Sequence, residues 1–198
     1  MIRFLKLIER INSRNEEIVC NIIRIIDNGD LETMNDIERL KSKLSDRHIE
    51  MCAPVDISDI RSFEKIYHIS LPQELVDFYT LISNGCQMID GFQLYPFEKW
   101  KFDSERINKP FEFKEYWIWE SESEPSHDFK DIENGIIELI DIGDAQSWNI
   151  VVEGDKRGEM WFYTDVGIQP ACPAMSFSKW FEYWLDGGTD YFYEFQYN

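Results

Sequence analysis

The sequence predicts an α+β fold in which N-terminal helices and a C-terminal helix pack on a mainly antiparallel sheet. Apolar residues follow a helical period through much of the first 85 residues. After Gly91, short runs rich in aromatic and β-branched residues are typical of strands. The segment 177–185 then returns to helical spacing. Helices, a meander of strands and a last helix are the order expected of an α+β domain.

Length, composition and charge exclude several classes of protein. The chain has 198 residues, of which 43% are hydrophobic and 15% aromatic, so it is long and apolar enough to bury a core. Its net charge of −18 disfavours nucleic acids and anionic membranes as partners. The first residues do not form a signal-peptide core, and no run approaches the roughly 20 apolar residues of a membrane span. We therefore expect a cytoplasmic protein.

The first 54 residues are expected to form a helical extension. One apolar stripe runs over residues 4–26 and ends at Asn28-Gly29, and a second, shorter stripe runs over residues 34–44. Neither contains a strand-like run, and Pro54 breaks the pattern. We expect a boundary here, with an α+β domain over residues 55–198.

Two further helices are expected before the strands. Ile60, Phe63 and Tyr67 mark the first, with Asp56 or Ser58 as its cap. The second begins near Ser70-Leu71-Pro72-Gln73, where a serine cap, a proline in the first turn and a capping-box glutamine are predicted. It continues through Phe78 to Asn84-Gly85, and we expect Leu71 and Phe78 to be buried against the sheet.

The predicted strands are short. Residues 154–158 form the turn of an antiparallel hairpin between the last two of them. The strand segments are 93–97, 113–120, 136–142, 148–152 and 160–163. The final helix over 177–185 includes Phe177 and Trp180 and ends at Gly187-Gly188.

Two blocks of sequence resemble the SUKH superfamily. The first combines Ile60, Phe63-Glu64 and Tyr67 with the residues Leu71, Pro72, Phe78, Asn84 and Gly85. The second combines Ile140, Gly143, Asp144, the strand 150–152, the turn through Gly158, the strand 160–163, Asp165, Phe177 and Trp180. Members of this superfamily include fungal cell-wall regulators and bacterial immunity proteins of polymorphic toxin systems. The resemblance covers about residues 55–190.

The sequence departs from the superfamily pattern in two places. Ala145-Gln146-Ser147-Trp148 stands after Gly143-Asp144, where a glycine-containing stretch is commonly expected. The segment 99–135 also has no clear counterpart. The resemblance implies that partner choice lies in variable surface, so these departures bear on the partner more than on the fold.

No pattern of residues indicates catalysis. The chain has three histidines and no zinc-protease, Walker or nucleophile-elbow motif. Ser126-His127-Asp128 is interpreted as a polar loop, His48 with Cys52 as helix-end packing, and Gly143-Asp144 as a turn in which Asp144 accepts backbone hydrogen bonds. The scattered cysteines suit reduced thiols. We expect no enzyme activity, no metal and no cofactor.

The segment 115–133 is the candidate partner surface. It contains seven carboxylates against one lysine, interleaved with two tryptophans. Aromatic anchors ringed by one sign of charge suit a complex with a basic partner. Trp117 and Trp119 share one strand face, however, so a core position is the alternative. The predicted binding residues are Trp117, Trp119, Glu120, Glu122, Glu124, Asp128 and Asp131.

Together, resemblance and charge predict an immunity protein that binds and neutralises a cognate toxin domain. The charge favours a basic nuclease as the toxin. A non-catalytic scaffold or regulator of the same superfamily is the alternative, and a small hydrolase ranks last.

Overall fold

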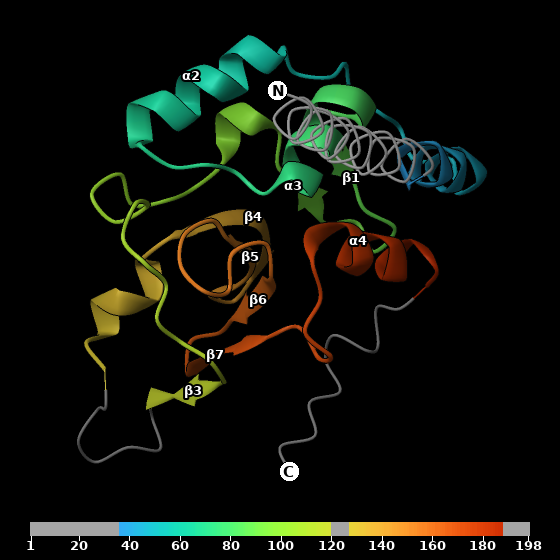
Figure 1. The fold of residues 1–198 in the computed structure, drawn as a ribbon. Helices are drawn as coiled ribbons and strands as arrows, with labels where there is room; N and C mark the ends of the chain where they lie inside the picture. Colours follow the sequence, from blue (N-terminus) through green and yellow to red (C-terminus); the bar gives the residue numbers. More distant parts are fainter. Residues whose placement is uncertain (1–35, 120–126, 188–198) are drawn as a thin grey trace, which may run out of the picture. The chain divides into compact units, whose positions relative to one another are not determined.

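The computed structural model describes residues 36–119 and 127–187 (Figure 1). The chain divides into two compact units, Met1–Leu40 and Lys41–Asn198, and the second carries every element from α2 onward. The helix predicted over residues 4–26 lies outside the described residues. Residues 36–46 are helical, as the second apolar stripe predicts. The domain boundary expected after residue 54 stays a prediction.

The helical elements that follow are short. They are α2 (Ile57–Tyr67), α3 (Gln73–Asp77), the π-helical turn η1 (Phe78–Ile82), the 3₁₀ turns η2 (Phe97–Lys99) and η4 (Phe129–Glu133), and α4 (Phe177–Leu185). Asp56 is the N-cap of α2, because its carboxylate accepts a 2.8 Å hydrogen bond from the Ser58 amide. This contact decides between the two predicted caps.

The start of α3 differs from the prediction. The helix begins at Gln73 with Pro72 as N-cap and no side-chain cap bond, so the expected capping box of Ser70 and Gln73 is wrong. The S-x-x-Q spacing requires a helix that begins two residues earlier. Gln73 instead donates through Nε2 to Asp77, one turn ahead, at 2.7 Å.

Asn84-Gly85 follows the helix as predicted, and each residue has its own role. Gly85 has a φ of +75°, and a Cβ at this position would lie 2.5 Å from the carbonyl oxygen of Leu94. Only glycine fits both conditions. The Asn84 side chain accepts a 2.7 Å hydrogen bond from the Phe97 amide, which joins the helix end to η2.

The main sheet has five strands in the order β3-β7-β6-β5-β4, and every pair is antiparallel. The strands are β3 (Trp117–Ile118), β4 (Ile136–Gly143), β5 (Gln146–Val151), β6 (Met160–Tyr163) and β7 (Gly167–Pro170), with β1 (Cys86–Gln87) and β2 (Gln93–Leu94) in a separate pair. The predicted α+β class and the β5–β6 hairpin are confirmed.

The predictions for the strands and for the β4–β5 turn need correction. The strands expected over residues 93–97 and 113–120 are reduced to Gln93–Leu94 and Trp117–Ile118 within the described residues. β1 and β7 were not predicted, and β7 separates β3 from β6. The β4–β5 turn has positive φ at Gly143, Asp144 and Ala145, and the carboxylate that accepts a hydrogen bond from the Gly143 amide belongs to Asp141.

The helices cover one face of the sheet, which we call the helical face (Figure 1). Trp148 on β5 lies 5.3 Å, between ring centroids, from Trp180 of α4, and Phe78 of η1 lies 4.8 Å from Phe181 of α4. Leu71 and Phe78 are 2% and 1% exposed, so their predicted burial is confirmed.

The opposite face, which we call the loop face, is covered by residues 101–116 and 127–133 (Figure 1). Strand alternation places Ser147, Asn149 and Val151 of β5 on this face, opposite Trp148 and Ile150 on the other. Its apolar core consists of Phe111, Phe113, Trp117, Ile132, Ile136, Val151, Trp161, Tyr163 and Ile168.

Candidate partner-binding surface

The two predicted tryptophans lie at one edge of the loop face. Trp117 of β3 pairs with Ile168 of β7, is 5% exposed, and packs as a core residue, the alternative that its strand position left open. Trp119 is half-buried, and its Nε1 donates a 3.1 Å hydrogen bond to the carbonyl of Asp165. The edge of the face therefore offers Trp119 rather than Trp117 to a partner.

Trp119 belongs to a cluster of rings that we call the aromatic corner, formed by Phe113, Trp117, Trp119, His127 and Phe129. The ring centroid of Trp119 lies 5.5 Å from Trp117 and 4.9 Å from Phe129 of η4, while His127 lies 4.6 Å from Phe113. Phe129 is 57% exposed, which is unusual for so large an apolar side chain. This residue was missing from the predicted set, although its place between Asp128 and Asp131 marked it in the sequence.

The predicted acidic residues have different roles where the structure describes them. Asp128 is the N-cap of η4 and accepts a hydrogen bond from the Lys130 amide at 3.0 Å. Asp131 accepts one from the Asn134 side chain at 3.3 Å and lies 3.8 Å from the guanidinium of Arg106. Glu120, Glu122 and Glu124 lie outside the described residues. The partner contact of these five acidic residues stays a prediction.

A hollow of about 540 Å³ opens on the loop face beside η4. Ile132 and Glu133 of η4 form one wall, and Lys101 to Ser104 form another. Its floor is the sheet itself, through Ile136, Glu138, Ser147, Asn149 and Tyr163. The aromatic corner and the hollow share η4, so one partner can contact both.

The sequence carried a signal for this hollow that strand prediction did not use. In β5, polar residues alternate with apolar ones, from Gln146-Ser147-Trp148 to Asn149-Ile150. Such a period of two predicts one apolar and one polar face, and Glu138 continues the polar face on β4, opposite Asn149. The polar face proved to be nearly as buried as the apolar one, because loops cover it: Ser147 is 9% and Asn149 1% exposed.

Ion pairs hold the open end of the hollow. The Lys101 ammonium lies 2.8 Å from Glu138 and 3.1 Å from Asp141. The hydrogen bond to Glu138, followed by one to Tyr95, raises the pKa of Lys101, so its charge is maintained. The Gly143 amide, followed by Lys101, lowers the pKa of Asp141.

Tyr163 fixes η4 against the sheet. Its hydroxyl donates a hydrogen bond to the carbonyl of Ile132, and both residues line the hollow. Burial, with a smaller contribution from Glu133, raises the pKa of Tyr163, so the phenol stays protonated and remains a donor.

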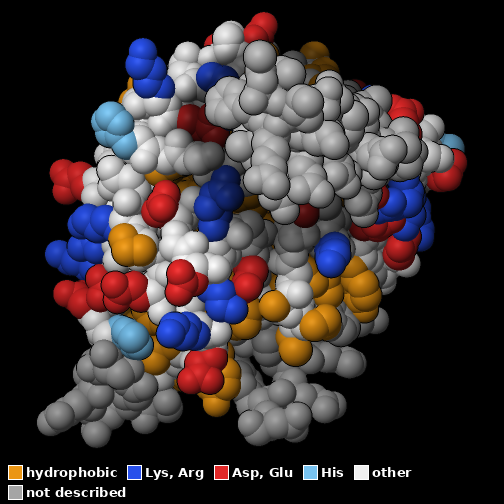
Figure 2. All heavy atoms as spheres, viewed as in Figure 1, with side chains coloured by type: hydrophobic (Ala, Val, Ile, Leu, Met, Phe, Trp, Pro, Cys, Tyr) orange, Lys and Arg blue, Asp and Glu red, His pale blue; other side chains and the backbone are white. Residues whose placement is uncertain are grey.

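Charges of both signs alternate on the face of the molecule that Figure 2 shows. In the view of Figure 2, aspartates and glutamates (red) are interleaved with lysines and arginines (blue) rather than gathered into one acidic area.

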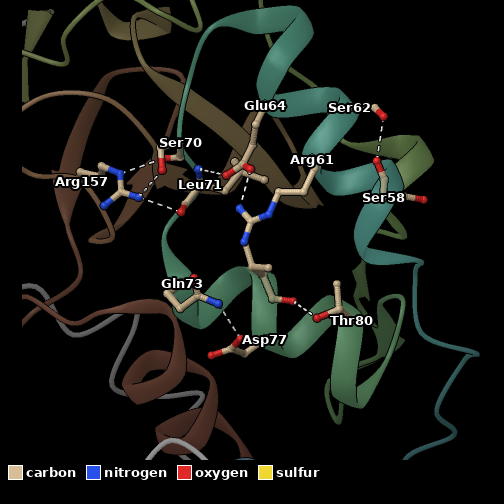
Figure 3. A network of polar contacts seen from close by, with 11 residues as sticks. Ser58, Arg61, Ser62, Glu64, Ser70, Leu71, Gln73, Asp77, Thr80 and Arg157 are labelled. Carbon is tan, nitrogen blue, oxygen red and sulfur yellow. Dashed lines mark hydrogen bonds and ion pairs between the residues drawn. The ribbon is translucent and has the colours of Figure 1, made fainter. Parts of the chain in front are cut away.

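The superfamily residues around Leu71 serve the fold. The buried carboxylate of Glu64 accepts hydrogen bonds from the Leu71 amide at 2.7 Å and from Arg61 at 2.6 Å (Figure 3). From the opposite side, Arg157 of the β5–β6 turn donates to the carbonyls of Ser70 and Leu71 at 2.9 and 2.7 Å. Both polar groups of the Leu71 backbone are thus held by charged side chains.

Helices on one face of an antiparallel sheet and a loop-covered hollow on the other define an α+β domain with a candidate binding surface. The SMI1 / KNR4 family (SUKH-1) model matches residues 54–184. The chain belongs to this family, which confirms the predicted resemblance. Comparison with curated proteins and with solved structures gave no significant match. The part of the chain that the structure describes contains no helix long and apolar enough to cross a membrane.

Proposed function

We propose that this protein is an immunity protein that binds a cognate toxin domain and neutralises it, acting in the cytoplasm. Family membership supports the proposal, since such roles occur in the superfamily that the sequence resembles. The observation that carries it is the loop face, where the turn η4 carries the exposed Phe129, which packs on the half-buried Trp119, and also supplies Ile132 and Glu133 to a hollow.

The toxin domain is proposed to be basic, with a nuclease as the preferred class. A net charge of −18 accelerates encounter with a cationic protein and disfavours nucleic acid itself. A nuclease must present positive charge to its substrate, so an acidic inhibitor competes for the same surface.

The proposed action is binding without catalysis. The charged side chains with shifted pKa values that lie near the hollow have structural partners: Lys101 holds Glu138 and Asp141, and Asp141 holds the Gly143 amide. The shifted pKa values of Lys101 and Asp141 favour their charged forms, which make structural ion pairs and hydrogen bonds. Neither shift favours proton exchange, as a catalytic acid or base would require.

Co-expression tests the proposal. The toxin domain encoded beside this gene is expressed alone, with this chain, and with an unrelated acidic protein of similar size. We expect growth only with this chain, and a stable complex of defined stoichiometry in light scattering. Growth arrest that this chain does not relieve would contradict the proposal and favour a scaffold or regulator.

A further inference from the structure

The floor of the hollow contains a side-chain acceptor for which the described residues supply no donor. Asn149 is 1% exposed, and its Nδ2 donates to the Ser147 carbonyl at 3.3 Å and to Ser147 Oγ at 2.9 Å. No hydrogen bond from residues 36–119 and 127–187 reaches the other side-chain atom, Oδ1, and this oxygen is not fully buried. Because Asn149 lines the hollow, Oδ1 can accept a hydrogen bond from a ligand that enters it.

The charges around this floor favour a cation. Asp103, Glu133 and Glu138 line the hollow, whereas Lys101 is the one basic side chain among the described lining residues. Lys101 is paired with Glu138, and Arg106 lies 3.8 Å from Asp103, so Glu133 is the lining carboxylate without an ion pair among the described residues. A group with several donors and a positive charge would satisfy both Glu133 and Asn149.

We propose that the hollow receives an arginine side chain of the partner protein. This inference rests on the proposed function and names the chemistry of its binding site. A guanidinium presents five N–H donors in one plane and is less strongly hydrated than an ammonium, so it suits an interior with several acceptors. Asn149 accepts at the floor, and Glu133 accepts at the wall.

The size of the hollow favours a protein over a free small cation. A volume of about 540 Å³ exceeds what one side chain fills, so the hollow also accommodates residues flanking the arginine. The aromatic corner lies on the same η4 turn, and the exposed ring of Phe129 offers an apolar contact to such a segment. The arginine is therefore expected to lie within a protruding loop of the partner.

An NMR titration of the full chain tests the site without the partner. The probe is acetyl-arginine-amide, and its neutral isostere acetyl-citrulline-amide is the matched control. We expect saturable shifts of the Asn149 side-chain amide and the Ser147 signals with the arginine probe, and at least fivefold weaker binding of the citrulline probe. Absence of saturable shifts, or equal shifts with both probes, would overturn the proposal.

Two matched variants locate the charge that matters. Glu133→Gln removes a carboxylate from the wall of the hollow, while Glu105→Gln removes one from an exposed residue of the same covering loop that does not line it. We expect Glu133→Gln to weaken the arginine probe about fivefold, as for loss of one ion pair, and Glu105→Gln to leave it unchanged. Equal effects of the two would show only general electrostatic attraction and would refute the site.

The outcomes separate this proposal from the proposed function. If the arginine probe binds the hollow but co-expression gives no protection, the hollow is confirmed and the immunity role fails. If co-expression protects, and Glu133→Gln binds the toxin domain as tightly as Glu105→Gln does, the immunity role stands and the arginine site is wrong.

Discussion

On its helical face the five-stranded sheet presents Trp148 and Phe162 to the helices, whereas on its loop face it presents Ser147 and Asn149 to a hollow. The first face is filled by interlocking aromatic rings. The second is covered by loops that meet the sheet around Trp161 and leave a polar space beside it. The same strands thus supply a rigid support on one side and a binding surface on the other, as expected where function lies on loops held by a scaffold.

The largest expected effect tests the rigid side of this comparison. Phe78 is 1% exposed and packs against Phe177 and Phe181 of α4 at 5.3 and 4.8 Å. We expect Phe78→Ala to lower the free energy of unfolding by about 3–5 kcal/mol, because it opens a cavity between packed rings. Chemical denaturation measures this loss. A loss below about 1 kcal/mol would mean that the helical face tolerates voids.

The second effect tests the binding side. Trp119→Ala removes a half-buried ring at the aromatic corner, with its hydrogen bond to Asp165. We expect affinity for the toxin domain to fall by about 2 kcal/mol, mainly through faster dissociation. Surface plasmon resonance measures the two rates, on a variant shown by circular dichroism to be folded.

Trp117→Ala is the matched control for that experiment. Because Trp117 lies in the core of the loop face, its loss should lower stability before it lowers affinity. Equal affinity losses in two folded variants would place both tryptophans in the interface.

A smaller effect tests how the loop face is held together. Tyr163→Phe removes the hydroxyl that binds the Ile132 carbonyl and leaves that buried acceptor unpaired. We expect a loss of about 1–2 kcal/mol in stability, with faster amide exchange concentrated in η4. Exchange that rises equally in α4 would show that the two faces are not independent.

The smallest expected effect is an increase in stability, from substitutions in the β4–β5 turn. Asp144 and Ala145 have φ values of 50° and 58° in the β4–β5 turn, a conformation that glycine adopts without strain. We expect Ala145→Gly to raise the free energy of unfolding by about 0.5–1 kcal/mol. Asp144→Gly should gain less, because aspartate tolerates this conformation better than alanine does. Thermal unfolding of both variants measures the difference.

Sequence patterns predicted the helical face better than the loop face, for physical reasons. The stripe of α4 and the strand β6 follow local periodicities, and both appear at the predicted residues. β7 was missed because Gly167-Ile168-Gln169-Pro170 has a weak strand signal, and its pairing with β3 joins segments some 50 residues apart.

The binding surface was predictable only in outline. The acidic and aromatic composition of residues 115–133 pointed to the edge of the sheet where Trp119 and Phe129 lie, but periodicity could not decide which tryptophan is less buried. The hollow needed knowledge of which loop covers β5. Asn149 and Lys101 are brought together by the pairing of Lys101 with Glu138, which no local pattern encodes.

Glu64 and Arg157 together form a clamp on the Leu71 backbone, and the two halves of this clamp differ in when they can form during folding. The Glu64 carboxylate is seven residues from the amide it holds, so this half of the clamp can form with α2 alone. The Arg157 guanidinium is 86 residues from the Leu71 carbonyl, and it reaches that carbonyl only after the β5–β6 hairpin has closed and met the helices. Formation of the second half therefore reports docking of the hairpin. Because this contact forms late, Arg157→Met is expected to speed unfolding while leaving the folding rate nearly unchanged.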